Sequence, residues 1–91
     1  MVKLIRAHVL ISGIVQGVYF RANTVEKARS LGLKGWVRNI NNNVEAVFEG
    51  PEEKIKEMLE WCKQGPDAAN VDHVEIEYQD YSGEFDYFER R

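Results

Sequence analysis

Apolar and polar residues alternate along four stretches of the chain, a pattern typical of strands that bury one face. In two other stretches apolar residues recur every three or four positions, which predicts amphipathic helices. The predicted strands cover residues 5–11, 34–40, 44–49 and 71–80. A short aromatic strand is expected near the end of the chain, with the residues Phe85, Tyr87 and Phe88.

The two predicted helices each have one apolar face. The buried stripe of the first should be Ala22, Val25, Ala28 and Leu31. Gly32 should end this helix, because glycine readily adopts the left-handed conformation found at helix ends. Pro51 suits the first position of the second helix, whose expected stripe is Ile55, Met58, Leu59 and Cys62. Cys62 is therefore predicted to be a small buried hydrophobic residue rather than a reactive thiol.

The order strand–helix–strand–strand–helix–strand predicts two split β-α-β units. The segment Asn41-Asn42-Asn43 predicts a tight hairpin turn between the second and third strands, since asparagine tolerates positive φ. Both helices can bury their apolar faces on one side of a mostly antiparallel sheet. We therefore predict an α+β, ferredoxin-like sandwich (βαββαβ) with a short extra C-terminal strand, in a single domain covering residues 1–91.

Charge and composition narrow the possible partners. The 91 residues carry a net charge of −3, whereas nucleic-acid-binding domains are usually basic, so no nucleic-acid partner is expected. The one cysteine cannot form an intramolecular disulfide, which favours a reducing cytoplasm. No apolar stretch is long enough to cross a membrane. The two histidines, His8 and His73, show no recognisable metal-ligand spacing, and no metal or cofactor is expected.

Residues 13–21 (GIVQGVYFR) lie between the first strand and the first helix. Backbone N–H groups at a strand–glycine loop–helix turn point outward and favour an anion. Arg21 adds a planar guanidinium that suits phosphate or carboxylate. Turns of this kind also occur without any ligand, so the pattern alone leaves that alternative open.

The side chains of this loop restrict the chemistry. Cysteine-dependent phosphatases carry their nucleophile six residues before the phosphate-binding arginine, and this chain has Val15 there. No serine, threonine or aspartate occurs in residues 13–20, so a covalent phosphoenzyme formed in the loop is not expected. A phosphate group bound here would be held, or attacked by water.

The segment from Ile11 to Arg21 resembles the signature of the acylphosphatase family, apolar-x-G-x-V-Q-G-V-x-F-R, at every specified position. Residues 35–39 (GWVRN) resemble the family's second signature, which precedes a hairpin. The two segments occur at family spacing, and the resemblance covers nearly the whole chain. One departure is the turn after Asn39, which is one residue shorter than usual and lacks glycine.

This resemblance implies an enzyme that hydrolyses acyl phosphates to a carboxylate and inorganic phosphate without metal or cofactor. It implies that Arg21 and Asn39 are catalytic: Arg21 would bind the phosphoryl group and Asn39 would orient the attacking water. It also implies that the phosphate contacts the loop backbone of Gln16, Gly17, Val18, Tyr19, Phe20 and Arg21. The expected ligands are a small acyl phosphate, or phosphate or sulfate in the loop, and the protein is expected to be a stand-alone monomer.

Three questions stay open on the sequence alone. The chain could be a non-catalytic anion-binding or regulatory module with the same fold and loop. Taken singly, Asn39 is also typical of a hairpin asparagine that hydrogen-bonds the backbone, and Arg38 of a solvated strand arginine. The group that orients Arg21 is not specified, and a carboxylate at Arg91 is one candidate.

Overall fold

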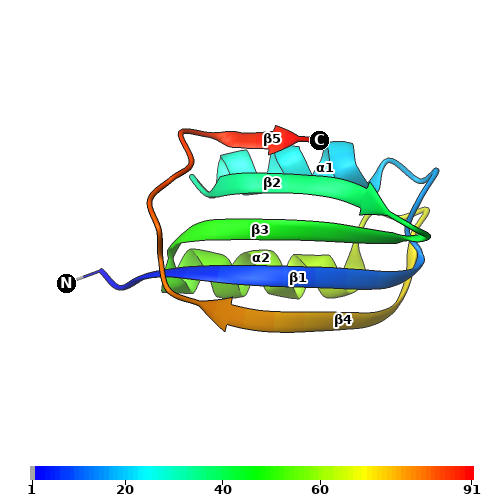
Figure 1. The fold of residues 1–91 in the computed structure, drawn as a ribbon. Helices are drawn as coiled ribbons and strands as arrows, with labels where there is room; N and C mark the ends of the chain where they lie inside the picture. The colour runs from blue at the N-terminus through cyan, green and yellow to red at the C-terminus, as the bar shows by residue number, and fades with distance from the viewer. Residues whose placement is uncertain (1) are drawn as a thin grey trace.

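A computed structural model describes residues 2–91, and its elements follow the predicted order (Figure 1). The strands and helices are β1 (Leu4–Ile14), α1 (Phe20–Ser30), β2 (Lys34–Ile40), β3 (Asn43–Pro51), α2 (Glu52–Gln64), β4 (Asn70–Gln79) and β5 (Phe88–Arg90). The strands form one sheet in the order β4-β1-β3-β2-β5. All neighbouring pairs are antiparallel except β2 and β5, which run parallel.

Both helices cover the same face of the sheet, which confirms the predicted ferredoxin-like fold (Figure 1). Inward residues of β1, β2 and β3 pack against α1 and α2, since alternate strand residues point to the same side. The fully buried strand residues on this face include Ala7, Val9, Ile11, Val37, Val44, Ala46 and Phe48. Cys62 is buried among them, and burial raises the pKa of its thiol to about 12, as expected for an unreactive core cysteine.

The buried face of α1 differs from the predicted stripe. Phe20, Thr24 and Ala28 are buried, whereas Ala22 is exposed and lines a pocket. Thr24 is accommodated because its hydroxyl donates a hydrogen bond to the Phe20 carbonyl at 2.7 Å. A three-residue spacing predicts that Ala22 is buried. The buried residues instead follow a four-residue spacing that begins at Phe20, whose ring anchors this face of the helix. The Phe20 ring packs edge-on against Trp61 of α2 at 5.5 Å between centroids.

Several predicted boundaries also shift, and Pro51, expected at the first position of the second helix, is instead the last residue of β3. The hairpin turn contains only Asn41 and Asn42, because Asn43 already pairs with Ile40 as the first residue of β3. Asn41 has a φ of 52°, the left-handed conformation that asparagine tolerates. The last strand begins at Phe88 and not at Phe85, whose ring lies under the Arg6 guanidinium at 5.4 Å, outside the sheet.

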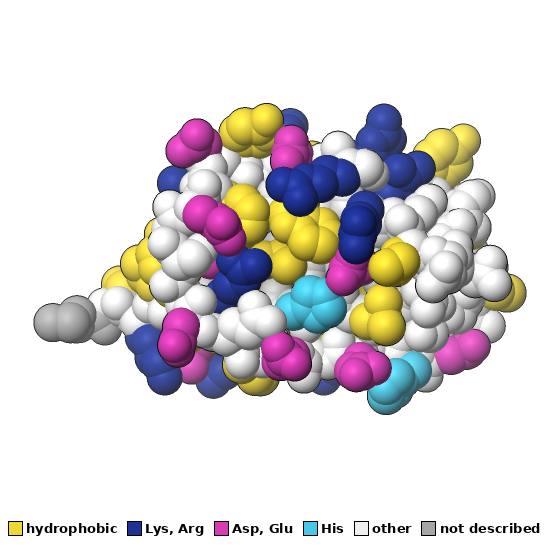
Figure 2. Space-filling model, viewed as in Figure 1, with side chains coloured by type: hydrophobic (Ala, Val, Ile, Leu, Met, Phe, Trp, Pro, Cys, Tyr) yellow, Lys and Arg dark blue, Asp and Glu magenta, His cyan; other side chains and the backbone are white. Residues whose placement is uncertain are grey.

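The other face of the sheet carries interspersed charges of both signs (Figure 2). Its most buried charge is Glu49 on β3, with only 2% of the side chain exposed. Glu49 accepts hydrogen bonds from the Ser82 N–H, the Ser82 hydroxyl and the Gly83 N–H, at 2.9, 2.7 and 3.1 Å. Arg6 donates to it at 3.3 Å. These contacts hold the segment that leads from β4 to β5 across the end of the sheet.

We expect Glu49→Gln to destabilise the fold by about 1–3 kcal/mol at pH 7, because buried donors lose a charged acceptor. Burial alone raises the pKa of Glu49, but the hydrogen bonds from Ser82, Arg6 and Gly83 outweigh it and hold the pKa below its usual value. A lowered pKa stabilises the folded state above the unfolded pKa, and this contribution is lost as the pH falls through the folded value.

Urea unfolding at pH 7 and pH 3 measures this prediction. The free energy of unfolding should fall less on acidification in Glu49→Gln than in the wild type. Glu26→Gln on the exposed side of α1 is the matched control and should behave as the wild type does. An identical acid dependence in wild type and Glu49→Gln would contradict the assignment.

Candidate active site

The connection from β1 to α1 is a short loop whose backbone is held in left-handed conformations. Gly17 has a φ of 73°, and Tyr19, the residue before α1, has a φ of 63°. A non-glycine residue in this region is strained unless its surroundings hold it. Asn23 does so, since its backbone N–H and its side-chain amide both donate to the Tyr19 carbonyl, at 3.1 and 2.8 Å.

This loop leaves the start of α1 open. No side chain caps the helix, and its first turn contains no acidic residue. Within residues 2–91, the backbone N–H groups of residues 16–22 have no hydrogen-bond partner from the protein. Free N–H groups at a helix N-terminus, together with the positive end of the helix dipole, make a site suited to an anion.

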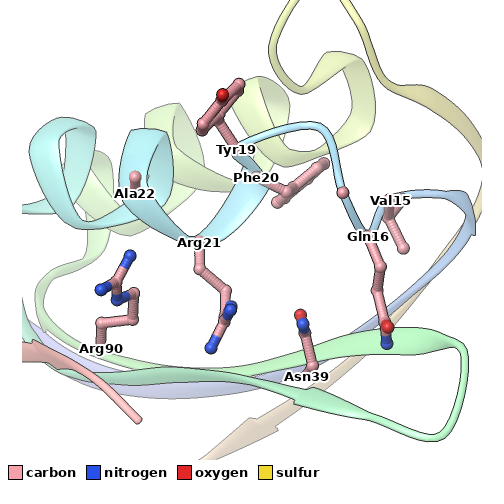
Figure 3. A pocket seen from close by; sticks show the side chains of 9 residues that line it. Val15, Gln16, Tyr19, Phe20, Arg21, Ala22, Asn39 and Arg90 are labelled. Atoms are coloured by element: carbon pink, nitrogen blue, oxygen red, sulfur yellow. The ribbon is translucent and has the colours of Figure 1, made fainter.

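Arg21 lies in the first turn of α1 and is half-buried. Its Nη1 donates a hydrogen bond to the backbone oxygen of Arg91 at 3.2 Å, so the contact considered for Arg91 is present. Arg91 is held in turn by its N–H, which bonds the Val37 carbonyl at 2.8 Å. The residue after β5 therefore holds one end of the Arg21 guanidinium, and the side chain projects into the space between the loop and the sheet (Figure 3).

Asn39 approaches the same space from the sheet. It lies two residues after Val37 on β2, so both side chains point to the helix-covered face. Val37 is buried beneath α1, whereas Asn39 is exposed because β2 extends past the start of that helix. In Figure 3 the side chains of Arg21 and Asn39 project into the space between the loop and the sheet.

These groups enclose a pocket of about 380 Å³. Its lining consists of Val15, Gln16, Gly17, Tyr19, Phe20, Arg21, Ala22, Asn39 and Arg90. Among the described residues, Arg21 and Arg90 are the charged side chains of this lining, and no carboxylate side chain contributes to it. The pocket is therefore positively charged in a chain whose net charge is −3, and it can bind an anion while presenting a neutral amide, Asn39, opposite the guanidinium.

The structure thus brings together most of the residues selected from the sequence. Gln16, Gly17, Tyr19, Phe20, Arg21 and Asn39 all line one pocket. Val18 does not line it, because its half-buried side chain packs against the core. Arg90 was missed by sequence reasoning: its place follows from the pairing of Val37 with Arg90 in the parallel β2–β5 ladder, which no local pattern indicates.

Two further observations concern metals and membranes. Across the described residues 2–91, no group of three or more His, Cys, Asp or Glu side chains has a geometry that could hold a metal ion. In the same part of the chain, neither helix is long and apolar enough to cross a membrane.

Comparison with known proteins shows the family to which this chain belongs. The family model described as acylphosphatase matches residues 7–90. The chain belongs to the acylphosphatase family. Among curated relatives, an acylphosphatase of Pelotomaculum thermopropionicum is 54% identical over 84 residues, which cover 91% of each chain. One from Haloarcula marismortui is 54% identical over 87 residues, or 94% of each chain.

A solved structure leads to the same family. The acylphosphatase of Coxiella burnetii superposes with a TM-score of 0.92 at 37% identity, and the match covers 97% of this chain and 93% of that one. The protein is therefore an acylphosphatase-family enzyme that hydrolyses acyl phosphates, as the two signatures predicted. The alternative of a non-catalytic module with this fold is set aside in favour of an enzyme.

Proposed function

We propose that this enzyme hydrolyses acyl phosphates by direct attack of water on phosphorus, without a metal or cofactor. The phosphoryl group would lie at the start of α1, and the water would lie at Asn39. The observation that carries the proposal is the shared pocket, in which the Arg21 and Asn39 side chains lie together (Figure 3), beside a loop whose N–H groups have no partner within residues 2–91.

The loop and Arg21 suit the phosphoryl group. Its transition state spreads negative charge over three equatorial oxygens, and fixed N–H donors plus a guanidinium stabilise that charge without having to reorganise. The N–H groups of residues 16–21 are held in place by the left-handed turns at Gly17 and Tyr19. Arg21 is held by the Arg91 oxygen at 3.2 Å.

Asn39 suits the water. The Asn39 side-chain oxygen can accept a hydrogen bond from the water and hold the water oxygen in line with the bond that breaks. A P–O bond forms to this oxygen, and the bond between phosphorus and the acyl oxygen breaks, its electron pair leaving with the carboxylate. Both water protons stay with the phosphate as it leaves, so the products are a carboxylate and dihydrogen phosphate.

The pocket has no carboxylic acid or histidine that could protonate the leaving group, and this chemistry requires none. Carboxylates have conjugate acids with a pKa of about 4, so they leave unprotonated at pH 7. An alcohol leaving group would need an acid. We therefore propose acyl phosphates, and not phosphate monoesters, as substrates, with free phosphate or sulfate as ligands of the same loop.

We also propose that residues 1–91 act as one domain and as a monomer in the cytoplasm. The single cysteine is buried and free of any disulfide, which suits a reducing compartment. The exposed large apolar side chains are distributed over β1, the β1–α1 loop, β4 and the segments beside β5: Val2, Leu4, Ile14, Tyr19, Tyr78, Tyr81 and Tyr87. Light scattering at micromolar concentration should give the mass of one chain, 10.5 kDa, and a dimer mass would contradict this.

Hydrolysis of acetyl phosphate in ¹⁸O-labelled water tests the mechanism. Attack on phosphorus places the label in inorganic phosphate and none in acetate. The rate should be unchanged by EDTA if no metal takes part. Label in acetate would show attack at the carbonyl carbon and would overturn the proposed roles of Arg21 and Asn39, while loss of activity in EDTA would overturn the metal-free mechanism.

A further inference from the structure

The side chain of Gln16 connects the two halves of the pocket. Its Nε2 donates hydrogen bonds to the carbonyl oxygens of Asn41 and Asn43, each at 2.9 Å. Gln16 belongs to the loop before α1, whereas one acceptor lies in the turn between β2 and β3 and the other on the first residue of β3. One primary amide has two N–H hydrogens, and both are used here. The same residue thus belongs to the proposed phosphate loop and holds the hairpin that carries Asn39.

The hairpin needs such support at this point. Its turn contains only Asn41 and Asn42, and Asn41 has a left-handed φ of 52°. The last ladder pairs before the turn are Asn39 with Val44 and Ile40 with Asn43. Asn39 therefore lies two residues from one carbonyl bonded by Gln16, at an exposed strand end that α1 does not cover. Motion of the turn relative to the loop would move Asn39 relative to Arg21.

We propose that Gln16 is a positioning residue for the hydrolysis, acting through Asn39 and not through the phosphate. This inference rests on the proposed function of the pocket. The two hydrogen bonds of the Gln16 side chain set the distance between the loop that holds the phosphoryl group and the strand that holds the water. Reaction rates fall steeply with such misplacement, by up to about 10²-fold for 1 Å.

Gln16→Met keeps the length of the side chain and removes both N–H donors. We expect kcat for acetyl phosphate to fall roughly tenfold. The KM and the inhibition constant of inorganic phosphate should change less than about threefold, because the loop N–H groups and Arg21 remain. Asn42→Ala is the matched control: it alters the same turn, leaves both acceptor carbonyls in place and should retain wild-type kcat.

A double-mutant cycle with Asn39→Ala separates positioning from a general loss of order. If Gln16 acts through Asn39, Gln16→Met should lower kcat less than about twofold once Asn39 is alanine. An equal fold-loss in both backgrounds would overturn the proposal, and so would a loss found in KM alone. Unfolding temperatures of all variants verify that each one is folded.

An NMR titration with inorganic phosphate, which involves no hydrolysis, tests the positioning role of Gln16 independently of the proposed function. In the wild type, titration with inorganic phosphate should shift the NMR signals of the Asn39 side-chain amide. In Gln16→Met the phosphate should still bind, but the Asn39 signals should shift less. If the wild type does not hydrolyse acetyl phosphate, the proposed function is wrong, and the NMR titration then decides the positioning role: unchanged Asn39 shifts in Gln16→Met would overturn it.

Discussion

Arg21→Ala is expected to lower kcat/KM for acetyl phosphate by at least roughly 10²–10³-fold, or about 3–4 kcal/mol of transition-state stabilisation. Arg21 is the cation in the first turn of α1, and its side chain projects into the pocket beside the loop whose N–H groups lack protein partners. Alanine leaves these N–H groups in place but removes the charge. The inhibition constant of inorganic phosphate should rise in parallel, because ground-state phosphate uses the same guanidinium.

The geometry of Arg21 also predicts the behaviour of Arg21→Lys. Lysine keeps the positive charge but cannot both bond the Arg91 oxygen and present a planar pair of donors to a phosphate. We expect it to recover only a small part of the loss. Arg38→Ala is the matched control, since Arg38 points to the opposite face of β2 and pairs with Glu45 at 2.6 Å. Near-wild-type activity of Arg21→Ala would remove Arg21 from the mechanism.

The part of the pocket that the sequence predicts is the part made by contiguous residues. Residues 13–21 contain a strand end, glycines and a helix start in succession, so the direction of their N–H groups follows from local structure alone. The position of Asn39 was also predictable in part. Alternation along β2 places Asn39 on the same face as Val37. Because β2 extends past the start of α1, the helix covers Val37 but leaves Asn39 exposed to solvent.

The remaining features depend on long-range register, which local patterns do not encode. Arg90 enters the pocket because β5 pairs in parallel with β2 at the edge of the sheet. The Gln16 side chain finds its acceptors 25 and 27 residues further along the chain. Each of these contacts becomes visible only when segments distant in sequence are placed together.

Asn39→Ala is expected to lower kcat for acetyl phosphate by roughly 10²-fold or more, with little change in phosphate binding. Asn39 contributes a neutral amide to a pocket whose charged lining residues are Arg21 and Arg90. Removing it takes away the group that holds the water but none of the groups that hold the phosphate. The inhibition constant of inorganic phosphate should therefore stay within about threefold of wild type, in contrast to Arg21→Ala.

Asn39→Asp distinguishes orientation of water from proton removal. Aspartate has nearly the shape of asparagine and is a far better base, so it would restore activity if the water needed a base. If the amide only orients the water, the carboxylate instead places a negative charge beside the phosphate and weakens its binding. We expect Asn39→Asp to be less active than Asn39→Ala at pH 7 and to recover below pH 4, where the carboxylate is protonated. Activity of Asn39→Asp above that of the wild type at pH 7 would show that the reaction requires a general base, which direct attack by an oriented water does not.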